Sequence, residues 1–194
     1  MKSTGWLIWT LCAALGACAS QPKEPPRIMM QGFSISAPKE KEKTWVVAQQ
    51  SPELTVIGKQ GRFTGESFSM QTTIIKLPAF TSSDAMMRYV ESSLRKEIDP
   101  KRFRLFKLET SEQKVHQQTC ALSRLEMAER TSSDGTASPV NTMLETMTLT
   151  CPHPQDPLRA INMAYSHRHF PEDLDPQFAQ EGAMLMQTLE FEPL

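Results

Sequence analysis

Three histidines in the C-terminal third of the chain carry the side chains best suited to metal chemistry. His167 and His169 are two residues apart, and His153 precedes them in a proline-rich stretch. If residues 160–170 form a strand, positions i and i+2 point to one face, so both imidazoles share a side of the sheet. Imidazoles beside carboxylates are ligands for Zn²⁺ and Cu²⁺. The acidic residues that follow closely are Glu172, Asp173 and Asp175.

A structural role for the same histidines is the simpler interpretation. The i, i+2 spacing is common in strands and has little specificity for metals. On that interpretation His167 and His169 complete a core face near its wet edge and hydrogen-bond to loop carbonyls. We expect this structural role, with no metal and no cofactor. Metal or small-ligand binding by His153, His167 and His169 is the alternative.

The first eighteen residues have the order of a secretory signal. Lys2 gives a positive start, and the apolar run that begins at Trp6 is about ten residues long, too short to span a ~30 Å hydrocarbon core. Residues 15–18, Leu15-Gly16-Ala17-Cys18, resemble the lipobox of bacterial lipoproteins. This resemblance implies cleavage after Ala17 and lipidation of Cys18. Ala19 at the next position favours the outer membrane, facing the periplasm. The alternative is an ordinary secretory signal with an incidental cysteine.

Two further cysteines, Cys120 and Cys151, would then lie in an oxidising compartment where disulfides persist. The turn-rich segment between them, 131–139, has its centre near Gly135, midway between the two cysteines. If the flanking segments form a hairpin, the cysteines fall opposite each other, at a separation that a disulfide can bridge. We therefore expect a Cys120–Cys151 disulfide. A reactive or metal-binding pair is the weaker alternative, because no C-x-x-C spacing is present.

Composition and motif searches narrow the class of function. The chain has 21 basic and 22 acidic residues and a formal net charge of −1, which does not favour a nucleic-acid partner. The sequence contains none of the G-x-S-x-G, H-E-x-x-H, P-loop or G-x-G-x-x-G signatures. We therefore expect no enzymatic activity, and an unrecognised hydrolase is the alternative.

The elements that must position these residues can be placed from periodicity and capping. Strands are expected at 33–36, 45–48, 54–57, 68–77, 140–151 and 160–170. A strand from Phe103 leads into a long polar strand through Cys120 to Glu129. A helix is expected over Ser83–Ile98, with an apolar stripe at three- and four-residue spacing. A second helix is expected after Asp175, with Pro176 at its first position. Its expected apolar stripe consists of Phe178, Gly182, Leu185, Met186 and Leu189. A short strand ends the chain.

This order predicts one α+β domain with a mainly antiparallel sheet and two helices. The expected divisions are a signal at 1–17, a lipidated tether at 18–31 and the domain at 32–194. The element order resembles the PsbP-like fold of small bacterial envelope lipoproteins, and this implies a non-catalytic accessory or binding protein. The expected partners are the membrane, through the lipid, and a protein of the cell envelope.

Overall fold

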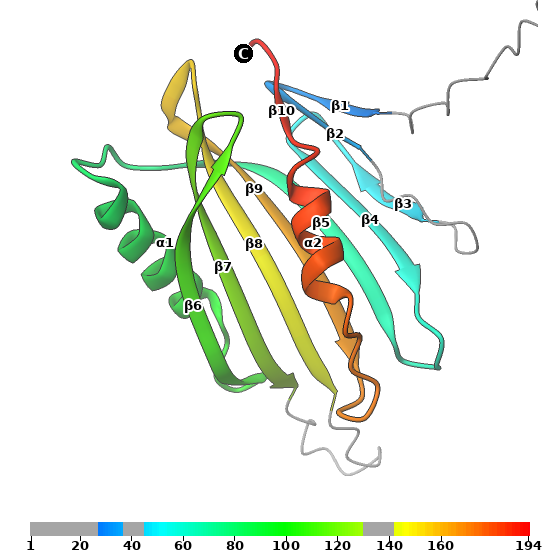
Figure 1. Cartoon of the computed structure of the whole chain (residues 1–194). Coiled ribbons are helices and arrows are strands. Elements are labelled where there is room, and N and C mark those ends of the chain that lie inside the picture. Colours follow the sequence, from blue (N-terminus) through cyan, green and yellow to red (C-terminus); the bar gives the residue numbers. More distant parts are fainter. Residues whose placement is uncertain (1–26, 37–44, 130–141) are drawn as a thin grey trace, which may run out of the picture.

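The computed structural model describes residues 27–36, 45–129 and 142–194 (Figure 1). The helices in this part of the chain are α1 (Ser83–Glu97) and α2 (Phe178–Met186). In chain order the strands are β1 (Arg27–Met30), β2 (Phe33–Ser36), β3 (Val46–Gln50), β4 (Leu54–Gln60), β5 (Ser67–Lys76), β6 (Phe103–Val115), β7 (Gln118–Glu129), β8 (Met143–His153), β9 (Asp156–His169) and β10 (Glu190–Phe191). The predicted α+β class is confirmed.

The main sheet has seven strands in the order β3-β4-β5-β9-β8-β7-β6, and all of its neighbours are antiparallel. A second sheet, with the order β1-β2-β10, joins the first described strands to the last one. β9 pairs with both β5 and β8, and this places it at the centre of the main sheet. The side chains of β9 therefore meet residues from distant parts of the sequence.

The two helices cover opposite faces of this sheet (Figure 1). α2 packs against β8 and β9, whereas α1 packs against β6 and β7. Successive residues of β7 show the division: Cys120 belongs to the core under α2, and Ala121 packs with Met86 and Val90 of α1. Because side chains alternate along a strand, β7 contributes residues to the cores on both faces of the sheet.

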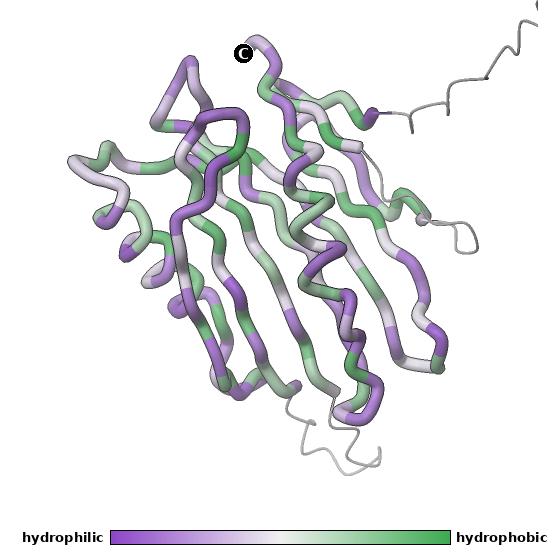
Figure 2. The backbone as a smooth tube through the Cα atoms, in the orientation of Figure 1, coloured by the Kyte–Doolittle hydropathy of each residue, from purple (hydrophilic) through white to green (hydrophobic). Residues whose placement is uncertain are grey.

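The larger core lies on the face under α2. Tyr165 of β9 and Met147 of β8 are both buried there. Gly182 allows α2 to approach closely, because a Cβ at this position would lie 2.7 Å from the Met147 sulfur. The apolar stripe predicted for this helix is confirmed by the burial of Phe178, Gly182, Leu185, Met186 and Leu189. Figure 2 shows the resulting alternation of hydrophobic and hydrophilic positions along α2.

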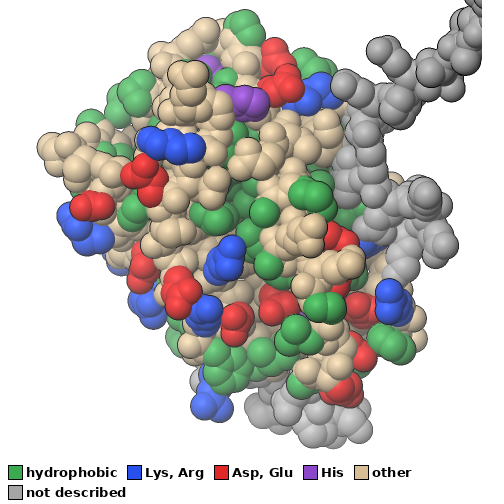
Figure 3. All heavy atoms as spheres, in the orientation of Figure 1, with side chains coloured by type: hydrophobic (Ala, Val, Ile, Leu, Met, Phe, Trp, Pro, Cys, Tyr) green, Lys and Arg blue, Asp and Glu red, His purple; other side chains and the backbone are tan. Residues whose placement is uncertain are grey.

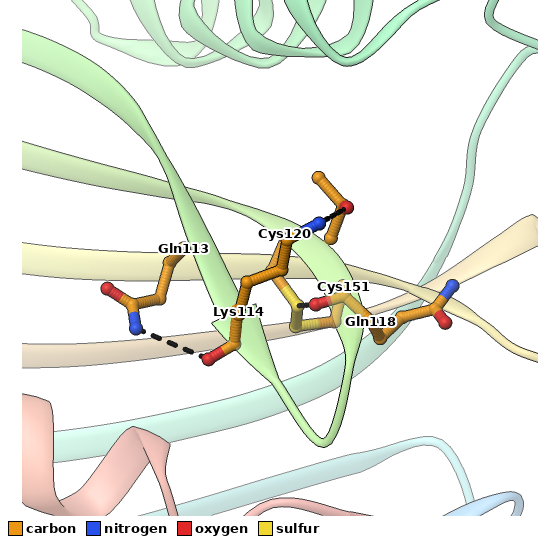
Figure 4. The surroundings of a disulfide bond; sticks show 6 residues. Gln113, Lys114, Gln118, Cys120 and Cys151 are labelled. Atoms are coloured by element: carbon orange, nitrogen blue, oxygen red, sulfur yellow. Dashed lines mark hydrogen bonds between the residues drawn. A yellow bond between two sulfur atoms is a disulfide. The ribbon is translucent and has the colours of Figure 1, made fainter.

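The disulfide joins Cys120 at the start of β7 to Cys151 near the end of β8, with 4.3 Å between the Cα atoms. Both residues are fully buried. Figure 4 shows the bond near the tip of the β6–β7 hairpin, beside Gln118. The turn segment from which the pairing was inferred, 131–139, lies outside the described residues. The pairing itself follows the register of β7 and β8, in which Ala121 is opposite Thr150.

Three expectations about element boundaries require correction. The tether was expected to continue to Gln31, but β1 begins at Arg27 and pairs with β2, and Met30 enters the core. The strand from Phe103 does not lead directly into the polar strand through Cys120, because the two form a hairpin with a turn at His116 and Gln117, which both have positive φ. The sequence offered no glycine or proline there to mark the turn.

The third correction concerns the second helix. Its first residue is Phe178 rather than Pro176, and the Asp175 carboxylate instead accepts the backbone N–H of Gln177. The first helix begins at Ser83 as predicted, and the Ser82 side chain accepts the N–H of Ala85 at its N-cap. Within the described residues, neither helix has both the length and the apolar character needed to cross a bilayer.

Candidate metal centre

The centre is built by the antiparallel pairing of β8 and β9. Glu145 on β8 lies directly opposite His167 on β9, and Met143 lies opposite His169. Because side chains alternate along a strand, His167 and His169 point to the same face as Tyr165, which is the face under α2. The hairpin therefore brings one carboxylate and two imidazoles together on the core side of the sheet.

Three side-chain atoms of this group converge without making a hydrogen bond. Glu145 Oε2 lies 3.9 Å from His167 Nδ1 and 3.6 Å from His169 Nε2. These distances are too long for hydrogen bonds, and all three atoms are buried without a partner. Buried polar groups normally have hydrogen-bond partners, so three unpartnered atoms that face one another require an explanation.

The ring of His169 is oriented by the backbone. His169 Nδ1 lies 2.6 Å from the carbonyl oxygen of Phe170. A carbonyl oxygen only accepts, so Nδ1 carries the proton. In neutral His169 the lone pair is therefore on Nε2, the atom that faces Glu145.

The ring of His167 is oriented by a second carboxylate. His167 Nε2 lies 3.0 Å from Oε1 of Glu66, the residue just before β5. Burial acts to raise the pKa of Glu66, but hydrogen bonds from His167 and from the backbone N–H groups of Arg62 and Phe63 outweigh it, so the pKa lies below its usual value. Glu66 is thus an anion that only accepts. His167 Nε2 carries the proton, and its Nδ1 lone pair faces Glu145.

With both imidazoles neutral, three lone pairs therefore meet at one buried point, and no proton of these groups lies between them. This arrangement is unfavourable unless a cation occupies the point, because a buried carboxylate oxygen without a partner is costly. Glu145, His167 and His169 offer three ligand atoms that all lie within 4.8 Å of one another. Bonds of about 2.0–2.2 Å to one ion place two ligands about 3.3–3.6 Å apart. The separations of 3.9 and 3.6 Å between Glu145 Oε2 and the two ring nitrogens lie close to this range.

The surroundings of the centre are aromatic and closed. Phe68 stacks on His167 with 4.1 Å between ring centroids, and the rings of His167 and His169 stack with 4.5 Å between them. Phe178, the first residue of α2, lies 6.0 Å from His167. The side chains of His167 and His169 are 0% and 1% exposed, whereas that of Glu145 is 17% exposed. Glu145 is therefore the most exposed member of the group.

His153 does not belong to this centre, so the three histidines of the alternative interpretation are not brought together. Its Nε2 lies 3.0 Å from the carbonyl oxygens of Gly32 and Glu192, and its Nδ1 accepts the N–H of Gln155. These bonds tie the β1–β2 turn and the chain after β10 to the end of β8. The loop-carbonyl role that the sequence suggested for His167 and His169 is thus filled completely by His153 instead. For His169 it accounts for one nitrogen, and for His167 it accounts for neither.

Sequence reasoning missed Glu145 and Glu66 and pointed instead to Glu172, Asp173 and Asp175. A signal for Glu145 was present: if the proline-rich stretch around His153 is taken as the turn between β8 and β9, residue 145 falls opposite residue 167. No comparable signal marks Glu66, which is 101 residues from His167 in the chain.

The other predicted site residues have different positions. Cys18 lies outside the described residues, and Cys120 and Cys151 form the disulfide. A pocket of about 390 Å³ lies between the start of α1 and the ends of β7, β8 and β9, away from the histidines. The described residues that line it include no His, Cys, Asp or Glu, so they do not supply the paired titratable groups of a catalytic site.

On the face that carries α2, the charged side chains of the described residues are of both signs (Figure 3). Figure 3 shows Lys and Arg interspersed with Asp and Glu on the face that carries α2. Arg102 pairs with Glu129, and Lys107 pairs with Glu109 and Glu126. Neither a protein-family model nor a curated protein matches this sequence.

Proposed function

We propose that this protein is a bacterial envelope lipoprotein whose α+β domain binds one transition-metal ion through Glu145, His167 and His169. The proposal rests on one observation: three buried ligand atoms face one another, and none of them has a hydrogen-bond partner. Hydrogen bonds to Glu66 and to the Phe170 carbonyl hold the two rings with their free nitrogens toward that point. Such outer partners usually accompany histidines that bind metals.

The chemistry of the ligands favours Zn²⁺ or Cu²⁺. Two imidazoles and one carboxylate suit borderline transition metals. Ca²⁺ requires six to eight oxygen ligands and Mg²⁺ requires an octahedral set of oxygens, which one carboxylate cannot supply. Because both imidazoles are almost fully buried, we assign the ion a bound or stored role. The proposed protein is a non-catalytic binding module.

The proposed cellular location of the protein rests on the sequence of residues 15–18 and on Ala19. We propose a lipid anchor at Cys18 in the outer membrane, with the domain facing the periplasm. The order of strands, helix, antiparallel meander, helix and final strand supports a PsbP-like fold. In this setting the domain acts as an accessory module for another protein of the envelope.

Metal titration of the full chain in detergent, after removal of metals with a chelator, tests the binding function. We expect one equivalent of Zn²⁺ to bind and to raise the free energy of unfolding, by about 2.7 kcal/mol at an ion concentration one hundred times the dissociation constant. Glu145→Gln should weaken binding at least tenfold, and the pair His167→Ala and His169→Ala should abolish it.

The matched control is His116→Asn. His116 is an exposed imidazole with φ of 46° in the β6–β7 turn, and asparagine tolerates that backbone conformation. This variant should bind Zn²⁺ as the wild type does. A folded wild-type protein that binds neither Zn²⁺ nor Cu²⁺, or a Glu145→Gln variant that binds them equally well, would refute the metal centre.

A further inference from the structure

The loop between β4 and β5 is built around one inward-pointing carboxylate. Residues 62–65 of this loop are exposed, but Glu66 is only 5% exposed. Its Oε2 accepts the backbone N–H groups of Arg62 and Phe63. The backbone N–H of Gly61 in turn donates to the Glu66 carbonyl at 2.9 Å. One oxygen of the carboxylate therefore holds the loop, and the other remains available for a partner on another strand.

Two glycines make this inward course of Glu66 sterically feasible. A Cβ at Gly61 would lie 2.2 Å from Glu66 Cγ, Cδ and Oε2, which is far inside contact distance. Gly65 has φ of +93°, a conformation that other residues rarely adopt. The loop is therefore shaped so that the residue after Gly65 can turn its carboxylate toward the sheet.

The second oxygen of Glu66 reaches the metal centre through His167. The Oε1–Nε2 distance is 3.0 Å, and both groups are buried. Phe68 lies parallel to the His167 ring, with an interplanar angle of 5°. Stacking fixes the plane of the ring, whereas the Glu66 hydrogen bond fixes which nitrogen carries the proton and which one faces Glu145.

We propose that Glu66 is a positioning residue for the metal centre, which selects the Nε2–H tautomer of His167 and so presents the Nδ1 lone pair to the ion. This inference rests on the proposed metal-binding function. Glu66 makes no contact with the ion itself. It forms the outer member of a carboxylate–histidine–metal arrangement, in which the loss of such a partner typically weakens binding 10- to 100-fold.

Glu66→Gln provides a sharp test, because it keeps the shape of the side chain and reverses one hydrogen bond. The amide oxygen must accept the N–H groups of Arg62 and Phe63, since an NH₂ group there would meet two donors. The amide NH₂ then faces His167 Nε2 and donates to it. His167 is forced into the Nδ1–H tautomer, and the proton points at the place of the ion.

Two measurements on the full chain in detergent distinguish this role from general loop stability. Nitrogen NMR of the histidine rings in the metal-free protein reports the tautomer, and competition with a chelator reports Zn²⁺ affinity. We expect the wild type to show Nε2–H at His167, and Glu66→Gln to show Nδ1–H with 10- to 100-fold weaker Zn²⁺ binding. Gly61→Ala, which displaces the carboxylate without altering its charge, should also weaken binding. Thr64→Ala, an exposed change in the same loop, should bind as the wild type does.

The outcomes separate the two proposals. Wild-type tautomer and affinity in both Glu66→Gln and Gly61→Ala would overturn the role of Glu66 and leave the metal centre intact. A wild type that binds no Zn²⁺ would overturn the metal centre and, with it, the positioning role. If Glu66→Gln does not fold, Gly61→Ala measured beside Thr64→Ala decides the question.

Discussion

At the scale of single residues, the direction of lone pairs decides what the histidines can do. His153, His167 and His169 are all buried to about the same degree, so burial alone does not distinguish them. Both ring nitrogens of His153 have partners, whereas His167 and His169 each retain one buried nitrogen without any. This difference is the reason for assigning His153 to the framework and the other two to the metal centre.

The disulfide is the second feature that acts at this scale. It closes a segment with a sequence separation of 31. By the loop-entropy estimate, a link of this length contributes about 3–4 kcal/mol to stability. Urea unfolding with and without a reductant should reveal a loss of this order in the wild type, and peptide mapping without reductant should recover the Cys120 and Cys151 peptides as a linked pair.

The control for this prediction is the double variant Cys120→Ala and Cys151→Ala, whose stability should not respond to the reductant. Recovery of both cysteines as free thiols from the native, oxidised protein would contradict the predicted bond.

At the scale of elements, the half-buried carboxylate of Glu129 joins the ends of several strands. Glu129 ends β7, and its Oε2 accepts hydrogen bonds from Arg168 of β9 at 2.8 Å and from Thr142, just before β8, at 3.0 Å. Its Oε1 accepts from Arg102, just before β6, at 3.2 Å. Burial acts to raise the pKa of Glu129, but the bonds from Thr142, Arg168 and Arg102 outweigh it and lower the pKa below the ordinary value of 4.5.

A lowered folded-state pKa makes this contribution sensitive to acid. The stabilisation by Glu129 is fully present above the unfolded-state pKa and is lost as the pH falls through the folded-state pKa. Glu129→Gln should therefore reduce the free energy of unfolding at about pH 7, by about 1 kcal/mol since its partners are partly exposed. The difference between variant and wild type should shrink below about pH 4.

Urea unfolding at the two pH values measures this difference. Glu172→Gln, a change of the same kind at an exposed position, should have little effect at either pH. An equal effect of Glu129→Gln at neutral and acidic pH would argue against the charged hydrogen bonds as its cause.

At the scale of the whole molecule, the described domain begins close to the proposed anchor. β1 starts at Arg27, which is paired into the small sheet through Ser36. The chain between Cys18 and Arg27 can span at most about 30 Å. The proposed lipid would therefore hold the domain near the membrane surface.

Substitution of the proposed lipid acceptor tests this arrangement. Cys18→Ala should abolish the incorporation of labelled fatty acid and release the protein from membranes once the signal is removed. Cys12→Ala, which changes a cysteine within the apolar run, should leave both properties unchanged. Full membrane retention of a signal-free Cys18→Ala protein would contradict the lipid anchor.

The sequence alone was sufficient to predict the features that depend on local periodicity. The strand pattern of residues 160–170 predicted that His167 and His169 lie on one face. The spacing of apolar residues predicted both helices. Both predictions are possible because strands and helices each impose a fixed repeat on the sequence. The Cys120–Cys151 pairing was also predicted from a local pattern, the turn-rich composition of residues 131–139 midway between the two cysteines. Turns without glycine or proline, such as that at His116, could not be predicted in this way because no turn-forming residue indicates their position.

Tertiary structure alone decided which carboxylates meet the histidines. Glu145 reaches His167 through the register of β8 and β9, and Glu66 reaches it from a hairpin 101 residues away. The sequence placed all three histidines near one another, but the fold separates His153 by bonding it to Gly32 and Glu192. The physical reason is that periodicity determines the face on which a side chain lies, whereas strand order, register and turn geometry determine its neighbours across the sheet.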